Sequence, residues 1–96
     1  MSGIEIKTLV YGEKTLMAQY RLAGGSVLPE HNHPHEQIGF LVSGRLRLYV
    51  GEDVKELGPG DSWCIAGNVT HKADIIEDAV AVEIFSPIRE DLLNFT

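Results

Sequence analysis

The chain has 96 residues, and chains this short rarely divide into separate cores, so we expect one domain over residues 1–96. Its 44% hydrophobic and 23% charged residues are typical of a globular protein and argue against disorder. A net charge of −6 argues against nucleic acid or an anionic membrane as a partner, because both require a basic surface.

The N-terminal residues 1–7 lack the basic region and apolar stretch of a secretion signal. No apolar run approaches the roughly 20 residues that a membrane helix needs. We therefore expect a soluble protein of the cytoplasm.

Short apolar stretches, separated by turns, make up most of the chain. Glycine marks the turns because it accepts the positive φ angles of tight turns, and turn signals recur roughly every 8–12 residues. Leu46 and Leu48 alternate with Arg45 and Arg47, which indicates a strand with one buried face. The pattern predicts an all-β sandwich or barrel. The candidate strands are residues 4–9, 15–22, 38–42, 45–50, 54–57, 62–65, 71–76 and 79–85.

A cluster of metal-ligating side chains lies among residues 29–37. In an extended backbone His31 and His33 project to the same face, where two imidazoles can reach one ion at ~2.0–2.2 Å. His71, from a distant strand, could supply a third imidazole. Nitrogen and oxygen donors suit Mn, Fe, Co, Ni, Cu or Zn. The alternative is that these are exposed loop histidines beside a proline.

Cys64 is the only cysteine, so the chain has no intramolecular disulfide. It lies in the mostly apolar run Trp63-Cys64-Ile65-Ala66. This setting predicts a buried, inert thiol rather than a reactive one.

Residues 79–85 are apolar on both faces of a predicted strand except at Glu83. Alternation places Glu83 on the same face as Phe85 and two alanines, which would leave room for a ligand. A carboxyl group in an apolar cavity near an ion is a candidate general acid or base. The alternative is a salt bridge from Glu83 to a neighbouring strand, for instance to Arg45 or Arg47.

The one predicted helix covers residues 87–94. Pro87 suits the first position of a helix, and Glu90 and Asp91 would face the positive end of its dipole.

The spacing of the histidines resembles the first motif of the cupin superfamily, Gly-x5-His-x-His-x3-Glu-x6-Gly. The matching positions are Gly25, His31, His33, Gln37 and Gly44. Gln37 stands where many cupins have Glu.

The second cupin motif, Gly-x5-Pro-x-Gly-x2-His, matches at Gly60 and His71 but not at Ala66 and Asn68. The resemblance implies a single-domain jelly-roll barrel, also called a double-stranded β-helix, with both motifs inside residues 25–71.

The same resemblance implies one divalent transition metal ion as the cofactor. Its ligands would be His31, His33, Gln37 and His71. Glu36, one residue away, is the alternative to Gln37, and we expect His35 to line the pocket or to lie outside it.

The C-terminal stretch Glu83-Ile84-Phe85-Ser86-Pro87-Ile88-Arg89-Glu90-Asp91 resembles that of one cupin group, the pectin-degradation proteins that linearise unsaturated uronates. The resemblance implies an isomerase that converts 4,5-unsaturated galacturonate or mannuronate to the open-chain keto sugar. Glu83 would transfer protons, Phe85 would shape the pocket, and Arg89 would bind the carboxylate of this small anionic substrate and assist catalysis.

Glu83 departs from the aspartate that is usual in that group. The extra methylene moves the carboxyl by roughly 1.5 Å, and displacements near 1 Å can cost about a hundredfold in rate. Two other functions therefore stay open, a non-catalytic cupin that binds a small acid and an iron-dependent dioxygenase. Small cupins usually pair, so we also expect a homodimer, formed through an outer sheet or by exchange of residues 4–9.

Overall fold

The computed structural model describes residues 2–95, in which seven strands form one antiparallel sheet. The all-β expectation is therefore confirmed. A single 3-10 helix, η1 (Glu90–Phe95), follows the last strand. The strands are β1 (Ile4–Tyr11), β2 (Leu16–Leu22), β3 (Val27–His31), β4 (Glu36–Val50), β5 (Asp53–Leu57), β6 (Ser62–Ile65) and β7 (His71–Ser86).

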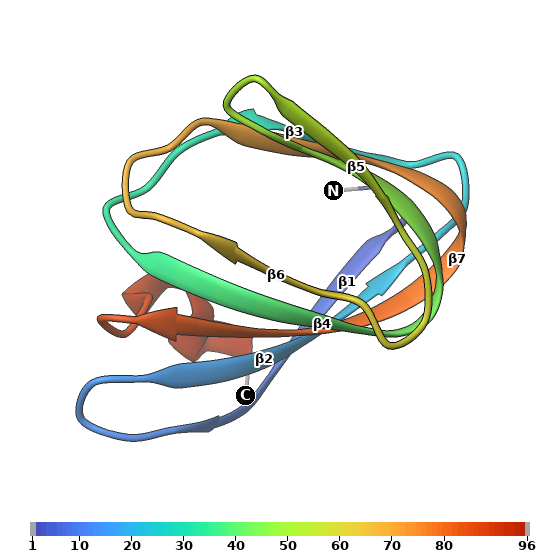
Figure 1. Cartoon of the computed structure of the whole chain (residues 1–96). Coiled ribbons are helices and arrows are strands. Elements are labelled where there is room, and N and C mark those ends of the chain that lie inside the picture. The colour runs from blue at the N-terminus through green and yellow to red at the C-terminus, as the bar shows by residue number, and fades with distance from the viewer. Residues whose placement is uncertain (1, 96) are drawn as a thin grey trace.

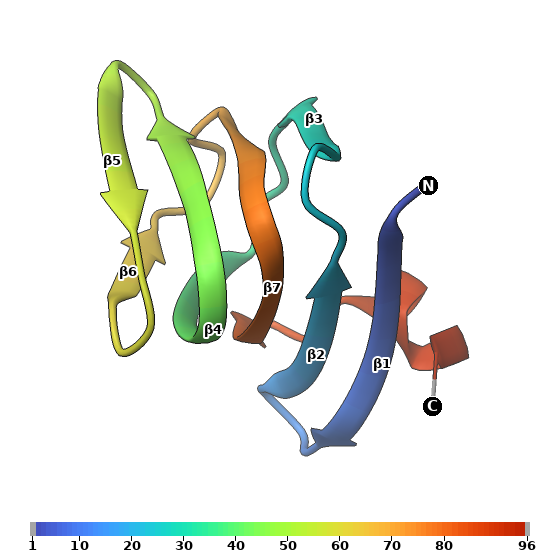
Figure 2. The ribbon, with the colours of Figure 1, turned by 90° about the vertical axis from the view of Figure 1, so that its right-hand side faces the viewer.

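The long strands β4 and β7 connect the two layers of the barrel. They pair with each other along most of their length, and β5, β4, β7, β2 and β1 lie side by side in that order (Figure 2). The first part of β7 also pairs with β3, and its second part with β2. Likewise, β6 pairs with the first part of β4 and β5 with its second part. The sheet therefore curls on itself and encloses an interior (Figure 1).

The two predicted strands on either side of Gly44 are one strand, β4. Gly44 is a bulge rather than a turn, with φ at 88° and no room for a side chain, because a Cβ would lie 2.2 Å from the carbonyl oxygen of Asp78. The pairing of β4 with β7 shifts register around this point. The shift changes which alternate residues face inward, so that Leu41 and Leu46 are both buried.

The predicted strands 71–76 and 79–85 are likewise continuous, as β7. Strand β3 was not predicted, since it is short, mostly exposed and interrupted by Pro29, which has no N–H to donate. It forms because the first part of β7 offers it a free edge for pairing.

The predicted helix at 87–94 is shorter than expected and of a different type. It begins at Glu90, and the N–H of Leu92 bonds the carbonyl of Arg89, the i−3 pattern of a 3-10 turn. Leu92 is fully buried, and its carbonyl accepts a hydrogen bond from the Thr8 hydroxyl on β1. Packing against β1 therefore holds this segment as a short 3-10 helix. Among residues 2–95, no helix is long and apolar enough to cross a membrane.

The prediction of a buried Cys64 is wrong. On β6 the side chains alternate, so Trp63 and Ile65 point toward the barrel interior, and Cys64 lies exposed on the outer face. The apolar neighbours of Cys64 belong to the opposite face of the strand.

Candidate metal centre and cavity

Two strands bring the three predicted histidine ligands together. His31, the last residue of β3, is paired with His71, the first residue of β7, and the centroids of their rings are 4.2 Å apart. His33 lies two residues after His31, and the centroid of its ring is 5.0 Å from that of His71. One nitrogen from each ring can be chosen so that all three lie within 4.8 Å of one another. The three side chains therefore form a site that could hold a metal ion.

In all three histidines the same ring nitrogen, Nδ1, lies within hydrogen-bond distance of the backbone. The Nδ1 atoms of His31, His33 and His71 each lie 2.8–3.0 Å from a backbone carbonyl oxygen. A carbonyl only accepts, so each Nδ1 carries the proton and each Nε2 keeps its lone pair. Metal-ligating histidines are commonly oriented through such hydrogen bonds.

The free nitrogens of two of these rings lack partners within the described residues. The Nε2 atoms of His33 and His71 are buried and make no hydrogen bond there. Burial, together with nearby positive charge, lowers the pKa of both rings. They are consequently neutral at neutral pH, which is the form that binds metal. This donor set fits a divalent transition metal.

Gln37 adds a third unpartnered ligand atom to those of His33 and His71. Its side-chain Nε2 donates a hydrogen bond of 2.8 Å to Glu83, whereas its Oε1 is buried without a partner in the described part of the chain. Glu36, the alternative ligand, precedes it on β4 and is exposed, since neighbouring residues of a strand face opposite sides. His35 is not a member of the three-histidine cluster.

Glu83 is buried in the barrel interior, on the same face of β7 as Phe85. Its carboxylate accepts hydrogen bonds from Gln37 and from the indole Nε1 of Trp63, at 2.8 and 3.1 Å. Burial raises the pKa of Glu83 to about 8, although both hydrogen bonds act in the opposite direction. A carboxyl with a pKa near neutrality is suited to exchange protons.

The alternative partners of Glu83 are engaged elsewhere. Arg45 and Arg47 both pair with Glu56 on β5, at 3.6 and 2.5 Å. Glu83 therefore has no salt bridge to either arginine.

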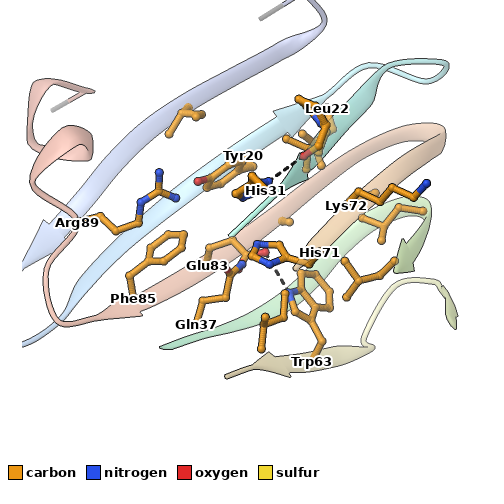
Figure 3. Close-up of a pocket in the computed structure, with 18 residues that line it drawn as sticks. Tyr20, Leu22, His31, Gln37, Trp63, His71, Lys72, Glu83, Phe85 and Arg89 are labelled. Carbon is orange, nitrogen blue, oxygen red and sulfur yellow. Dashed lines mark hydrogen bonds between the residues drawn. The ribbon is translucent and has the colours of Figure 1, made fainter. Parts of the chain in front are cut away.

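Arg89 and Phe85 lie to one side of this group (Figure 3). The Arg89 guanidinium stacks 4.8 Å from the centroid of the Phe85 ring, and its Nε and an Nη donate to Asp91 at 3.3 and 2.7 Å. Tyr20, from β2, is buried beside them, and burial raises its pKa to about 12. A cation, a phenol and a carboxyl thus face a shared space.

That space is a cavity of about 290 Å³, large enough for a small organic acid. Gln37, Glu83 and His71 group together on its wall (Figure 3). Among the described residues, Glu83 is the one carboxylate that lines it. Leucines and isoleucines line much of the remaining surface, so polar contacts are confined to a few groups.

Two residues of the cavity wall, Trp63 and Tyr20, were not identified from the sequence. Both occupy inward positions of alternating strands, so alternation could have placed them inside the barrel. The hydrogen-bond partner of Trp63 is Glu83, from a distant strand, and no local pattern reveals that contact.

Residues 18–86 match the cupin domain family Cupin_2, and the chain belongs to that family. The fold and the resemblance expected from the sequence are thereby confirmed.

Among individual proteins, the chain is 27% identical to the pectin degradation protein KdgF of Dickeya dadantii (strain 3937), over 95% of this chain and 84% of that protein. The solved structure of KdgF from a Halomonas species superimposes with a TM-score of 0.92 and 28% identity, covering 96% of this chain and 86% of that one. An RmlC-like cupin from Shewanella frigidimarina NCIMB 400 gives a TM-score of 0.91 and 26% identity, covering 95% and 82%.

Proposed function

We propose that this cupin binds one divalent transition metal ion through His31, His33, Gln37 and His71. The support is the set of donor atoms without partners, the Nε2 atoms of His33 and His71 and the Oε1 of Gln37, together with backbone hydrogen bonds that fix all three rings. All four proposed ligands are uncharged, so a bound ion would keep its full charge toward an anionic ligand.

We further propose that the protein opens the ring of a 4,5-unsaturated uronate and tautomerises it to the open-chain keto sugar. This proposal depends on one observation, that the groups needed for a sugar acid face the same cavity. Arg89 and Glu83 both line it, beside the proposed ligands His71 and Gln37. The similarity to pectin degradation proteins points to the same substrate class.

Each residue has a distinct task in this reaction. Arg89 binds the carboxylate of the substrate, because its planar guanidinium can pair with both oxygens. Phe85 packs beneath Arg89 and shapes the cavity wall. The reaction is an isomerisation, in which one proton leaves a hydroxyl and one is added at carbon, so a single carboxyl at Glu83 can carry protons in both directions. A bound metal ion would act as a Lewis acid on substrate oxygens without redox change.

Turnover of 4,5-unsaturated galacturonate, followed by NMR under anaerobic conditions, tests this proposal. We expect the metal-loaded protein to form the open-chain keto sugar without oxygen, and Glu83→Ala to be inactive. A reaction that requires oxygen would indicate a dioxygenase instead. Ligand-induced stabilisation without turnover of any unsaturated uronate would indicate a binding protein.

We also propose that the protein is a homodimer that pairs through the outer face of the sheet. Ile38, Phe40 and Val42 alternate along β4 with their side chains exposed on this face. Val82 and Ile84 on β7 border them and are only half-buried. The alternative is exchange of β1, which in the structure pairs with β2 of its own chain.

A further inference from the structure

Three residues form a row across the sheet beside the proposed metal ligands. Gly39 on β4 is paired with Trp63 on β6 and, on its other side, with Glu83 on β7. Residues paired in this way point to the same face, so Trp63 and Glu83 both face the interior across a glycine. A Cβ at Gly39 would lie only 2.2 Å from the indole ring. The absence of a side chain at Gly39 therefore lets the indole lie over β4 and reach Glu83.

Both oxygens of Glu83 are engaged by donors. Oε1 accepts from the Trp63 indole Nε1 at 3.1 Å, and Oε2 accepts from the Gln37 side-chain Nε2 at 2.8 Å. Gln37 and Glu83 are 7% and 8% exposed, so water does not easily replace either contact.

The amide of Gln37 can face an ionised Glu83 in only one of its two orientations, and the structure has this orientation, with the NH₂ group toward Oε2. An ionised carboxyl accepts hydrogen bonds and donates none, so it bonds the NH₂ group and not the oxygen. The amide oxygen is then turned away from Glu83, and it is the atom that has no partner in the described residues. Only this oxygen, and not the NH₂ group, has a lone pair that a metal ion can share.

We propose that Trp63 and Glu83 are positioning residues that hold Gln37 with its amide oxygen toward the metal ion. This inference rests on the proposed metal site and deepens it. It also accounts for glutamine at position 37, because a glutamate there has no NH₂ group to donate to Glu83, and two ionised carboxylates in contact would repel each other.

Replacing Glu83 by glutamine should reverse the orientation of the Gln37 amide. The Trp63 indole can only donate, so it holds the amide oxygen of the new side chain and leaves its NH₂ group facing position 37. Gln37 then turns its own oxygen toward that NH₂ group and presents its NH₂ group to the metal. A second change, Gln37→Glu, restores every contact, since a carboxylate at 37 accepts the new hydrogen bond and still offers an oxygen to the ion.

Titration calorimetry with Ni²⁺ alone, on metal-free protein, tests this inference. The four proteins are the wild type, Glu83→Gln, Gln37→Glu and the double variant. We expect Glu83→Gln to weaken Ni²⁺ binding by about tenfold or more. We also expect Gln37→Glu to raise the affinity at least about tenfold more in the Glu83→Gln background than in the wild type. Equal effects of Gln37→Glu in both backgrounds would show that the two positions are independent and would overturn the inference.

Glu36→Gln is the matched control, because it makes the reciprocal change on the exposed side of β4 and should leave Ni²⁺ binding unchanged. Thermal unfolding of each metal-free variant checks that it folds. A wild type that does not bind Ni²⁺ would reject the proposed metal site itself. If the wild type binds Ni²⁺ but the effects of the two substitutions on affinity are additive, only the positioning role is rejected.

A measurement on the wild type needs no variant. The side-chain NH₂ of Gln37 is buried and bonded to Glu83, so in the Zn²⁺-loaded protein its protons should exchange slowly with solvent, as measured by NMR. Rapid exchange of these protons would contradict the proposed orientation.

Discussion

His31 and His71 lie directly opposite each other at the point where β3 meets β7, 40 positions apart in the chain, and their rings are in contact at a centroid distance of 4.2 Å. Strand pairing alone therefore creates half of the proposed metal site. Since this pairing also holds the edge of the barrel, metal binding and the stability of β3 should be coupled.

His71→Ala should purify with less than about a tenth of the metal carried by the wild type, because it removes a buried ligand and the ring that faces His31. His33→Ala should behave in the same way. Elemental analysis of the purified proteins measures both. His35→Ala is the matched control, because His35 lies near His33 but outside the cluster, and it should keep its metal. Full metal content in His71→Ala would reject the assignment.

The positions of the histidine cluster could be predicted from spacing, since His31 and His33 are two residues apart and strand alternation puts them on one face. The third histidine could be linked to them through the resemblance to cupins, as its distance in the chain gives no geometric information. The burial of Glu83 followed from its apolar neighbours. Its partners Gln37 and Trp63 did not, because register between distant strands determines those contacts.

The errors in the fold have a common cause. Glycine favours turns, so the sequence predicts a turn at Gly44, but the same positive φ also suits a bulge inside a strand. The apolar neighbours of Cys64 predict a buried thiol, whereas strand alternation places it on the outer face, where the structure has it. In both cases the pairing between strands determines the conformation or the burial of the residue, and local composition contains no information on that pairing.

Gly39→Ala should lower the free energy of unfolding by about 1–3 kcal/mol, because the added methyl group would overlap the Trp63 indole and force it to move. Urea denaturation followed by circular dichroism measures this change. Gly12→Ala is the control, since nothing lies within 4 Å of the added methyl group, and it should change the stability by no more than about 0.5 kcal/mol. Equal stability of the two variants would contradict the close approach at Gly39.

Tyr20 should make the protein less stable as the pH rises from about 10 to about 12. Burial raises its pKa in the folded state to about 12, from an ordinary value of 10. In this window the unfolded chain loses the phenolic proton and the folded chain keeps it, so the unfolded state is favoured by up to about 2–3 kcal/mol. In Tyr20→Phe the free energy of unfolding, measured by urea denaturation, should lack this decrease between about pH 10 and about pH 12. Tyr11→Phe, which alters an exposed ring, is the control and should follow the wild type.

Arg89→Lys should raise the KM for 4,5-unsaturated galacturonate by about tenfold or more without changing Ni²⁺ affinity. Lysine keeps the charge but loses the planar fork that pairs with a carboxylate, and it also loses the stacking on Phe85. Steady-state kinetics and calorimetry measure the two quantities. Arg21→Lys, at an exposed position of β2, should leave both unchanged. An unchanged KM in Arg89→Lys would mean that another group binds the carboxylate.

Phe40→Lys should convert the proposed homodimer to a monomer. The ring of Phe40 lies between Ile38 and Val42 on the exposed face of β4, and a buried ammonium group in a dimer interface would be strongly unfavourable. Size-exclusion chromatography with light scattering measures the mass of both proteins. Val54→Lys is the matched control, because Val54 is similarly exposed, at 55% against 48%, but lies on β5, which pairs with the second part of β4 rather than with the part that carries Phe40. It should remain dimeric. A wild type that is monomeric at all concentrations would reject the dimer, and a dimeric Phe40→Lys would place the interface elsewhere on the barrel.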